Sequence, residues 1–230
     1  MQNSVTSPRI GDPAPGFTLP AAEREGTVSL SDFRDSSAVL LAINRGLWCS
    51  FCRRYIVLLG QVRDRLRQLG VETLAIVAAP PDRARLYVKH RAVGVPLALD
   101  SDLKVHRAYG LSMPPVTPEL EALWKTVRVR LDEAALNPAD LSALKQAAGG
   151  QLELPLYDFV GVTRRLYPYE TTKGEEQDRA RNNTLGTGQF LVDREGVLRW
   201  VKLQSTTDLA APISSPADEA ELLAAAQALR

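Results

Sequence analysis

The two cysteines of this 230-residue chain stand three positions apart, between two segments of contrasting pattern. Residues 39–43 before them are uniformly apolar, and an amphipathic stretch with apolar positions at near-helical spacing begins at Arg53 and ends at Leu69. An uninterrupted apolar run is typical of a strand buried on both faces, and the second pattern is typical of a helix that packs by one face. The sequence therefore predicts that Cys49 lies at a strand-to-helix junction.

This placement favours reactive thiols. A sulfur at the start of a helix lies near unpaired backbone N–H groups and the positive end of the helix dipole, which stabilise the thiolate. Cys52 lies one turn later on the same side and can close a disulfide with Cys49. Arg45 adds positive charge, as do Arg53 and Arg54, which we expect on the helix surface. The pattern predicts a dithiol redox centre.

Two other interpretations of the cysteines are less favoured. They could be inert core residues, although a strand-to-helix junction is an unusual place for these. A zinc site needs two more ligands, and the histidines, His90 and His106, stand on predicted amphipathic helices without metal-like spacing. We therefore expect neither a metal nor another cofactor.

Composition narrows the class of partner. With 45% hydrophobic and 24% charged residues, the chain can bury one substantial core. A net charge of +1, with basic and acidic residues intermixed, predicts binding neither to nucleic acid nor to a membrane surface. The sequence shows no apolar run that could span a bilayer and no secretory signal in residues 1–15, so we expect a cytoplasmic protein.

The remaining pattern predicts an α/β domain over residues 1–230 that contains an insertion at residues 112–186. A hairpin is expected at 17–30, further strands at 71–79 and 97–99, helices at 82–93 and 102–109, a hairpin at 189–201 and a terminal helix from Ser215. Within the insertion, helices are expected at 117–131 and 137–148. Residues 151–183 mix aromatic and charged positions without an assignable pattern.

Four ordered motifs resemble the alkyl hydroperoxide reductase and thiol-specific antioxidant group, which is peroxiredoxin-like. The resemblance covers residues 9–110 and 187–230 and implies a thioredoxin-like fold, a central mixed sheet flanked by helices, with the mostly helical insertion before the last hairpin. The motifs are Gly11-Asp12-Pro13-Ala14-Pro15-x-Phe17-x-Leu19, Val28-x-Leu30-Ser31-Asp32-Phe33, Arg45-Gly46-x-Trp48-Cys49-x-x-Cys52 and Phe190-Leu191-Val192-Asp193-Arg194-Glu195-Gly196-Val197.

The resemblance gives the site two alignments. The peroxiredoxin signature Pro-x-x-x-Thr-x-x-Cys places its cysteine on Cys52, its threonine on Cys49 and its proline on Arg45. The pattern of thioredoxin-like reductases instead makes Cys49 the attacking thiol and Cys52 the resolving one, with Thr187 at the position of their cis-proline. In many peroxiredoxins that last position holds an arginine that supports the thiolate, so Arg45 or another residue is left to supply charge here.

The function implied by the resemblance is reduction of hydroperoxides by the Cys49–Cys52 dithiol, which an external thioredoxin- or glutaredoxin-like reductant then restores. Protein disulfide exchange is the alternative. A third hypothesis is a non-catalytic scaffold or redox sensor that binds a partner through its insertion. Formation of a homodimer is compatible with each of these functions.

Three supporting features have two interpretations each. Trp48 either shields the thiolate or packs beneath the turn. Arg45 either assists the thiolate and peroxide or is a solvated arginine. The insertion's aromatic residues (Tyr157, Phe159, Tyr167 and Tyr169) either cover the dithiol or, as we favour, form the insertion's own core.

Overall fold

A five-stranded mixed sheet organises the protein, whose computed structural model describes residues 7–91, 93–111, 117–166, 168, 172–182, 185–204 and 216–229. The strand order is β5-β4-β3-β8-β9; β3, β4 and β5 run parallel, while β8 is antiparallel to β3 and β9 to β8. The five strands are β3 (Ala38–Asn44), β4 (Val71–Val77), β5 (Leu97–Leu99), β8 (Thr187–Val192) and β9 (Leu198–Gln204).

The predicted central strand occupies the middle of this sheet. Every residue of β3 is buried, because helices and loops cover both faces of the sheet and strands flank it on both sides. Leu41 pairs with Leu74 on one side and with Phe190 on the other. This continuous apolar pairing fixes the register of β3 and therefore the point at which the chain leaves the sheet toward Cys49.

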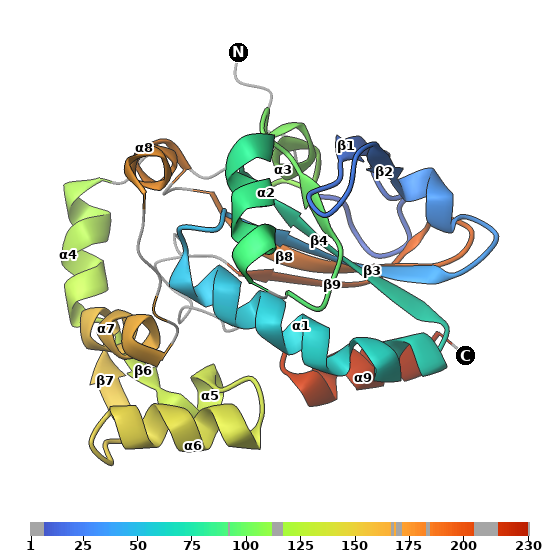
Figure 1. Ribbon diagram of the computed structural model, residues 1–230. Coiled ribbons are helices and arrows are strands. Elements are labelled where there is room, and N and C mark those ends of the chain that lie inside the picture. The colour runs from blue at the N-terminus through green and yellow to red at the C-terminus, as the bar shows by residue number, and fades with distance from the viewer. Residues whose placement is uncertain are drawn as a thin grey trace.

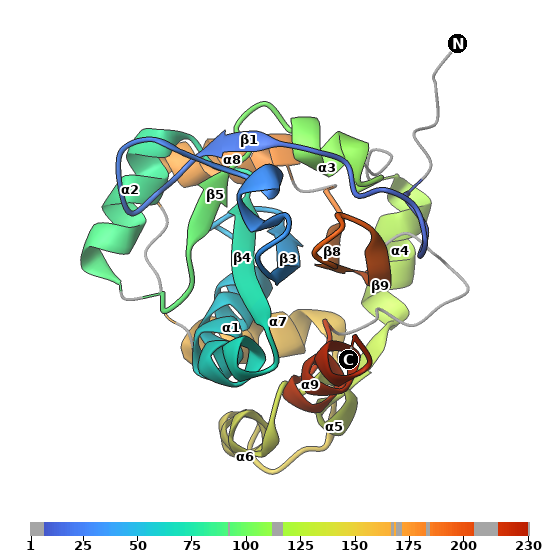
Figure 2. The same cartoon turned by 90° about the vertical axis from the view of Figure 1, so that its right-hand side faces the viewer.

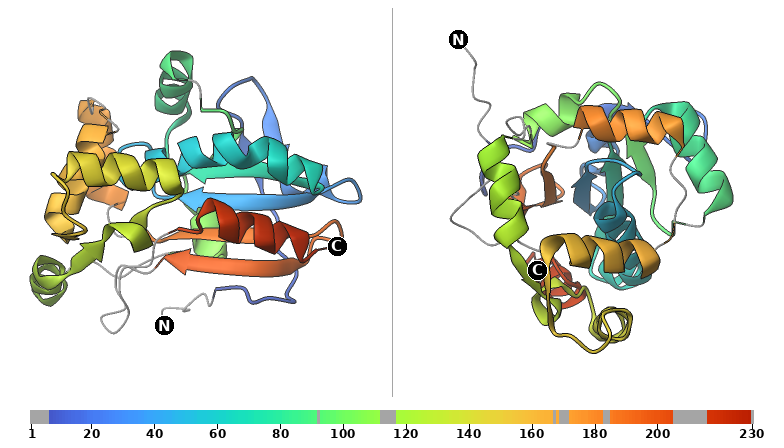
Figure 3. Two further views of the ribbon diagram at one scale, coloured as in Figure 1. Left: turned by 90° about the horizontal axis from the view of Figure 1, so that it is seen from below. Right: turned by 90° about the vertical axis from the view of Figure 1, so that its left-hand side faces the viewer.

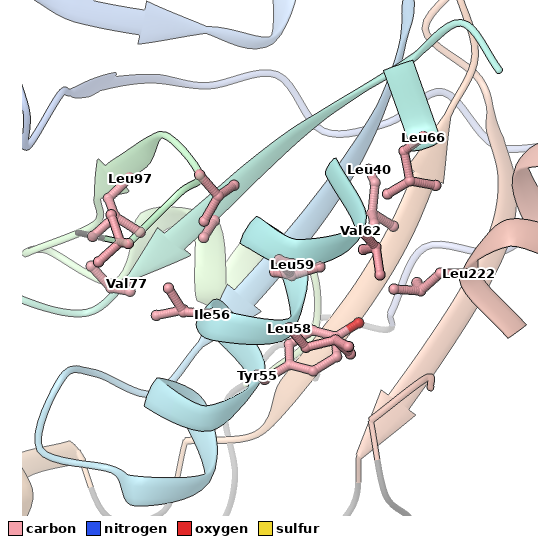
Figure 4. Close-up of a cluster of buried hydrophobic side chains, with 14 of the residues drawn as sticks. Leu40, Tyr55, Ile56, Leu58, Leu59, Val62, Leu66, Val77, Leu97 and Leu222 are labelled. Atoms are coloured by element: carbon pink, nitrogen blue, oxygen red, sulfur yellow. The ribbon is translucent and has the colours of Figure 1, made fainter. Parts of the chain in front are cut away.

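Helices α1 (Ser50–Gln68) and α9 (Glu219–Gln227) cover one face of the sheet, as Figures 1 and 2 show. Apolar residues of α1 meet those of β3, β4, β5 and α9 in one cluster, drawn in Figure 4. Ile56, Leu59 and Val62 of α1 are fully buried there. Helix α2 (Pro81–His90) packs beside α1 and contributes Ala84 and Tyr87.

The opposite face is covered by the predicted N-terminal hairpin and by α3 (Lys104–Ala108). The hairpin consists of β1 (Thr18–Pro20) and β2 (Thr27–Ser29), followed by a 3-10 turn at Leu30–Phe33. Its Leu19 joins Val105 and Tyr109 in a second apolar cluster. The Tyr109 ring packs edge-on against Phe190, with centroids 4.7 Å apart.

The elements of the insertion gather at the end of the sheet where α1 begins (Figures 1 and 3). The segment that the sequence left unassigned contains a strand and two helices, β7, α7 and α8; Tyr167 and Tyr169 lie outside the described residues. The elements are α4 (Pro118–Thr126), β6 (Arg128–Arg130), α5 (Leu131–Ala134), α6 (Pro138–Ala147), β7 (Glu153–Pro155), α7 (Leu156–Leu166) and α8 (Lys173–Asn182).

The insertion has an apolar core of its own, centred on α7. Phe159 and Val162 of α7 meet Leu131 of α5, Leu144 of α6 and Leu154 of β7. An ion pair of 2.8 Å between Arg83 of α2 and Asp178 ties α8 to the main domain. Through the described part of the chain, helices are too short or too polar to cross a membrane.

Candidate functional site

Cys49 and Cys52 lie together at the beginning of α1, as the sequence predicts. Cys49 is the N-cap residue, and its sulfur accepts the backbone N–H of Cys52 at 3.4 Å. Both cysteines are free thiols, and the exposed fractions are 4% for Cys49 and 2% for Cys52. The neighbouring backbone and the thiol of Cys52 therefore supply the polar surroundings of the Cys49 sulfur.

The two thiols have opposite pKa shifts. The Cys52 thiol, which hydrogen-bonds to the Cys49 sulfur, lowers the pKa of Cys49 from 9.0 to about 6; burial opposes this, while Arg45 and the N–H groups of Cys52 and Phe51 assist it. Burial raises the pKa of Cys52 well above 9.0, and its contact with Cys49 raises it further. Cys49 is therefore the thiolate near neutral pH, and Cys52 is the thiol that stabilises it.

Arg45 and Trp48 contribute N–H donors to the site. The Arg45 Nε and Trp48 Nε1 atoms are buried and have no hydrogen-bond partner among the described residues. Both side chains are half-buried, so other parts of them meet solvent. Arg45 is near enough to lower the pKa of Cys49, so its unpaired Nε–H group is available to a ligand that accepts hydrogen bonds there, whereas Nε1 of Trp48 lies against Gly46.

The turn that leads to Cys49 depends on Gly46. Gly46 has a φ of +149°, and the backbone N–H of Cys49 donates to its carbonyl at 3.3 Å. A Cβ atom on Gly46 would lie 2.7 Å from Nε1 of Trp48 and 3.2 Å from the carbonyl oxygen of Ala78. The indole of Trp48 therefore packs directly over Gly46, a contact that only glycine permits.

Replacing Gly46 with alanine should lower the free energy of unfolding by about 1–3 kcal/mol and displace the Trp48 indole, because backbone strain and a side-chain clash act together. Urea unfolding followed by tryptophan fluorescence measures both effects. Gly149→Ala is the matched control, since Gly149 also has a positive φ but no atom within 4 Å of its added Cβ. Equal losses of stability in the two variants would show that the indole contact is unimportant.

Thr187 lies where the sheet meets residues 45–48, the loop that leads from β3 to Cys49 and is called the redox loop below. Ile43 pairs with Gly188, so Thr187 is opposite the last residue of β3 on the neighbouring strand. It is buried, and its hydroxyl hydrogen-bonds to the side chain of Gln204 on β9. Thr187 is thus part of the wall beside the loop, and its support of the thiolate stays a prediction.

The expectation that Arg53 and Arg54 lie on the helix surface is wrong. They are 5% and 4% exposed, because the insertion covers this part of α1. Arg53 donates to the carbonyl oxygen of Leu47 at 2.7 Å, which holds the redox loop against α1. Arg54 forms an ion pair of 2.9 Å with Asp140 of α6 and also donates to the carbonyl oxygen of Ala134.

The first turn of α1 also contacts α7 of the insertion. The Ser50 and Thr163 hydroxyls lie 3.4 Å apart, and the Phe51 and Phe159 rings have centroids 5.5 Å apart. Phe159 belongs to the insertion's own core, which is the interpretation that we favoured from the sequence. It also contacts Phe51, which lies between the two cysteines in the sequence. The sequence patterns did not identify Thr163, which contacts Ser50, or Asp140, which pairs with Arg54. Both residues stand far from the cysteines in the sequence and match no motif.

A hollow of about 500 Å³ lies elsewhere, bordered by Glu23, Arg63 and Thr73. Thr73 is near the beginning of β4, whereas Cys49 follows the end of the parallel strand β3. The hollow is therefore at the opposite end of the sheet from the thiols and has no part in their chemistry. Within the described residues, no cluster of three or more His, Cys, Asp or Glu side chains could hold a metal ion.

The fold and the site together define a thioredoxin-fold protein with two thiols at the start of its first long helix. Residues 10–130 match the model of the AhpC/TSA family, and the chain belongs to that family. This confirms the resemblance that the sequence motifs carry.

Two kinds of relative resemble the chain. It is 27% identical over 109 residues to the thiol-disulfide oxidoreductase ResA of Bacillus thuringiensis, a match covering 47% of this chain and 61% of that protein. Reduced 2-Cys peroxiredoxin of Plasmodium vivax superposes with a TM-score of 0.55 and 13% identity, over 96% of this chain and 95% of that chain. Mycobacterium tuberculosis AhpC superposes with a TM-score of 0.55 and 11% identity, over 97% of this chain and 94% of that chain. These structural matches show the fold.

Proposed function

We propose that this protein reduces small hydroperoxides, with Cys49 as the attacking thiol and Cys52 as the resolving thiol. The observation that carries the proposal is a thiolate at Cys49 that is almost fully buried and lies near Arg45, whose Nε–H group is unpaired. A peroxide is small enough to enter such a site and offers two oxygen atoms that accept hydrogen bonds. Membership of the AhpC/TSA family supports the same chemistry.

The oxidising step transfers one oxygen atom to sulfur. The Cys49 thiolate attacks the terminal oxygen of the hydroperoxide; an S–O bond forms, the O–O bond breaks, and the leaving alkoxide takes a proton and departs as an alcohol. Cys49 becomes a sulfenic acid. Arg45 is placed to donate a hydrogen bond to the oxygen atoms, on which negative charge develops as the O–O bond breaks.

The resolving step closes an internal disulfide. The sulfur of Cys52 attacks the sulfenic sulfur of Cys49, an S–S bond forms, and the hydroxyl group leaves as water with the proton of Cys52. An external dithiol of the thioredoxin or glutaredoxin type then reduces the disulfide and becomes oxidised itself. The cytoplasm, which keeps such reductants in their reduced state, is the compartment that this cycle suits.

Mass spectrometry of reduced protein treated with one equivalent of hydrogen peroxide and dimedone tests the proposal. Wild type should lose two hydrogens and gain no dimedone, since the internal disulfide forms first. In Cys52→Ser, dimedone should attach to Cys49, while Cys49→Ser should remain unmodified. If neither cysteine is oxidised faster than free cysteine, the peroxidase is excluded.

Disulfide exchange is the second candidate, and the likeness to a thiol-disulfide oxidoreductase together with the low pKa of Cys49 favours it. Burial of both sulfur atoms restricts access for a protein disulfide, and equally for the external dithiol of the peroxidase cycle, so burial does not separate the two candidates. Reduction of insulin disulfides, measured beside peroxide consumption, separates the two activities. Absence of both activities would favour the scaffold hypothesis instead.

A further inference from the structure

Asp100 and His106 form a buried pair beneath the loop of residues 45–48 that leads to Cys49. His106 of α3 is fully buried, and Asp100, which follows β5, is 1% exposed. The Nδ1 atom of His106 lies 2.7 Å from Oδ2 of Asp100, and its Nε2 atom lies 3.1 Å from the carbonyl oxygen of Asn44. The imidazole therefore bridges a carboxylate and the last residue of β3.

Both ring nitrogens face oxygen atoms that accept hydrogen bonds. Asp100 also accepts the backbone N–H groups of Lys104 and His106, each at 2.9 Å. Burial raises the pKa of Asp100, but these bonds and the His106 ring together hold it below its usual value, so the carboxylate is ionised. The Nε2–H group of His106 donates to the carbonyl oxygen of Asn44, and Nδ1 faces the Asp100 carboxylate, so the ring is held from both sides.

The backbone that connects Asp100 and His106 is strained. Leu103 has a φ of +59°, in the left-handed region that residues with a side chain rarely adopt. Its N–H donates to the carbonyl oxygen of Asp100, and its own carbonyl accepts the N–H of Arg107. This turn folds α3 back so that the ring of His106 reaches both Asp100 and β3.

The peptide bond that His106 contacts also reaches the dithiol. It joins Asn44 to Arg45; burial and the contact with Cys49 raise the pKa of Cys52, and the N–H group of this peptide, on Arg45, lowers it. In a trans peptide the C=O and N–H groups point in opposite directions, so one rigid unit connects the imidazole to the sulfur. A hydrogen bond donated to the carbonyl polarises the peptide and strengthens its N–H as a donor.

We propose that His106, held by Asp100, is a positioning residue for the resolving cysteine. It fixes and polarises the Asn44–Arg45 peptide so that the N–H of Arg45 stabilises the sulfur of Cys52 as this sulfur loses its proton and attacks. The inference rests on the proposed function for the step it assists. The geometry predicts an effect on Cys52 that is larger than any effect on Cys49.

Stopped-flow tryptophan fluorescence during oxidation by hydrogen peroxide tests this assignment. His106→Gln keeps a neutral donor near the Asn44 carbonyl, whereas His106→Leu removes it. Disulfide closure, which is independent of peroxide concentration, should slow by about three- to tenfold in His106→Gln and further in His106→Leu. The peroxide-dependent oxidation of Cys49 should stay within about twofold, whereas a merely structural role would slow both phases alike.

A second measurement does not depend on peroxidase activity. In the Cys49→Ser background, the rate at which iodoacetamide alkylates Cys52 at pH 8 reports its thiolate fraction. His106→Gln should lower this rate by about three- to tenfold, and His90→Gln, which changes an exposed histidine on α2, should leave it unchanged. Equal alkylation rates with and without the His106 change would overturn the inference even in an active peroxidase.

Discussion

Oxidation of Cys49 by hydrogen peroxide should accelerate about tenfold between pH 5 and pH 7 and then level off, because the thiolate is the reactive form and the pKa of Cys49 is about 6. Below the pKa the sulfur is protonated and slow; above it nearly all molecules carry the thiolate. Stopped-flow tryptophan fluorescence at constant ionic strength gives the rate constant at each pH. A rate that still climbs steeply above pH 8 would contradict the assignment of Cys49 as the stabilised thiolate.

Two substitutions of Cys52 test why the pKa of Cys49 is low. Cys52→Ser keeps a hydroxyl donor for the Cys49 sulfur, whereas Cys52→Ala removes the donor. Since the bond from Cys52 is the largest cause of the lowering, the midpoint of the pH profile should move toward 9.0 in the alanine variant and less in the serine variant. Midpoints that stay near 6 in both variants would assign the low pKa to the helix start and Arg45.

The thiolate alone does not account for a fast peroxidase. At pH 7 a pKa of 6 gives about 90-fold more thiolate than a pKa of 9.0, but a weaker base is also a weaker nucleophile, by about 20-fold over the same interval. The net gain is only about fourfold. The N–H donors of Arg45 must therefore supply most of any larger acceleration, by stabilising the charge on the peroxide oxygens.

Arg45→Gln measures that contribution. Above pH 8 Cys49 stays ionised in wild type, so a loss of rate there reflects the missing guanidinium more than a changed protonation state. The rate should fall about 10- to 100-fold, as expected for a charge-assisted hydrogen bond made in the transition state. An unchanged rate at high pH would limit Arg45 to its electrostatic effect on the pKa. A peroxide titration at pH 8.5 suffices for the comparison.

Local pattern was sufficient to predict the sheet and the position of the thiols. The apolar run before Arg45 and the helical spacing after Cys52 each arise from burial of one continuous segment, which is a property that sequence shows directly. The N-terminal hairpin follows equally from its turn residues. The same reasoning placed Cys49 at a helix start, where the structure shows it as the N-cap.

The surroundings of the site could not be predicted in this way. Arg54 looks like any charged residue on an amphipathic helix, and its charged partner Asp140 stands 86 positions later in the sequence. Helix α8 is polar along most of its length, so it lacks the apolar stripe by which helices are recognised. His106 looks like a solvent-facing residue of a short helix until Asp100 and Asn44 are seen around its ring.

Removing the carboxylate of Asp140 should be the most destabilising single change in the insertion. In Asp140→Ala, the guanidinium of Arg54 stays buried without its charged partner, and Leu136 loses the acceptor for its N–H, which donates to Asp140 at 2.8 Å. Breaking a buried ion pair in this way costs about 3–5 kcal/mol. Urea unfolding followed by circular dichroism gives the free energy of unfolding. Asp132→Ala is the matched control and should cost less than about 1 kcal/mol, since its pair with Arg130 is about half exposed.

The double variant Arg54→Met, Asp140→Leu distinguishes the two reasons for this loss. If the uncompensated charge is responsible, two apolar residues of similar volume should recover most of the stability, because they remove the buried charge while they keep the contact between α1 and α6. If the pair is needed to hold the insertion against α1, the double variant should stay as unstable as Asp140→Ala. Iodoacetamide should then alkylate Cys49 faster than in wild type, since the insertion would no longer cover the first turn of α1. The exposed fraction of 4% at Cys49 leaves a wide range for such an increase.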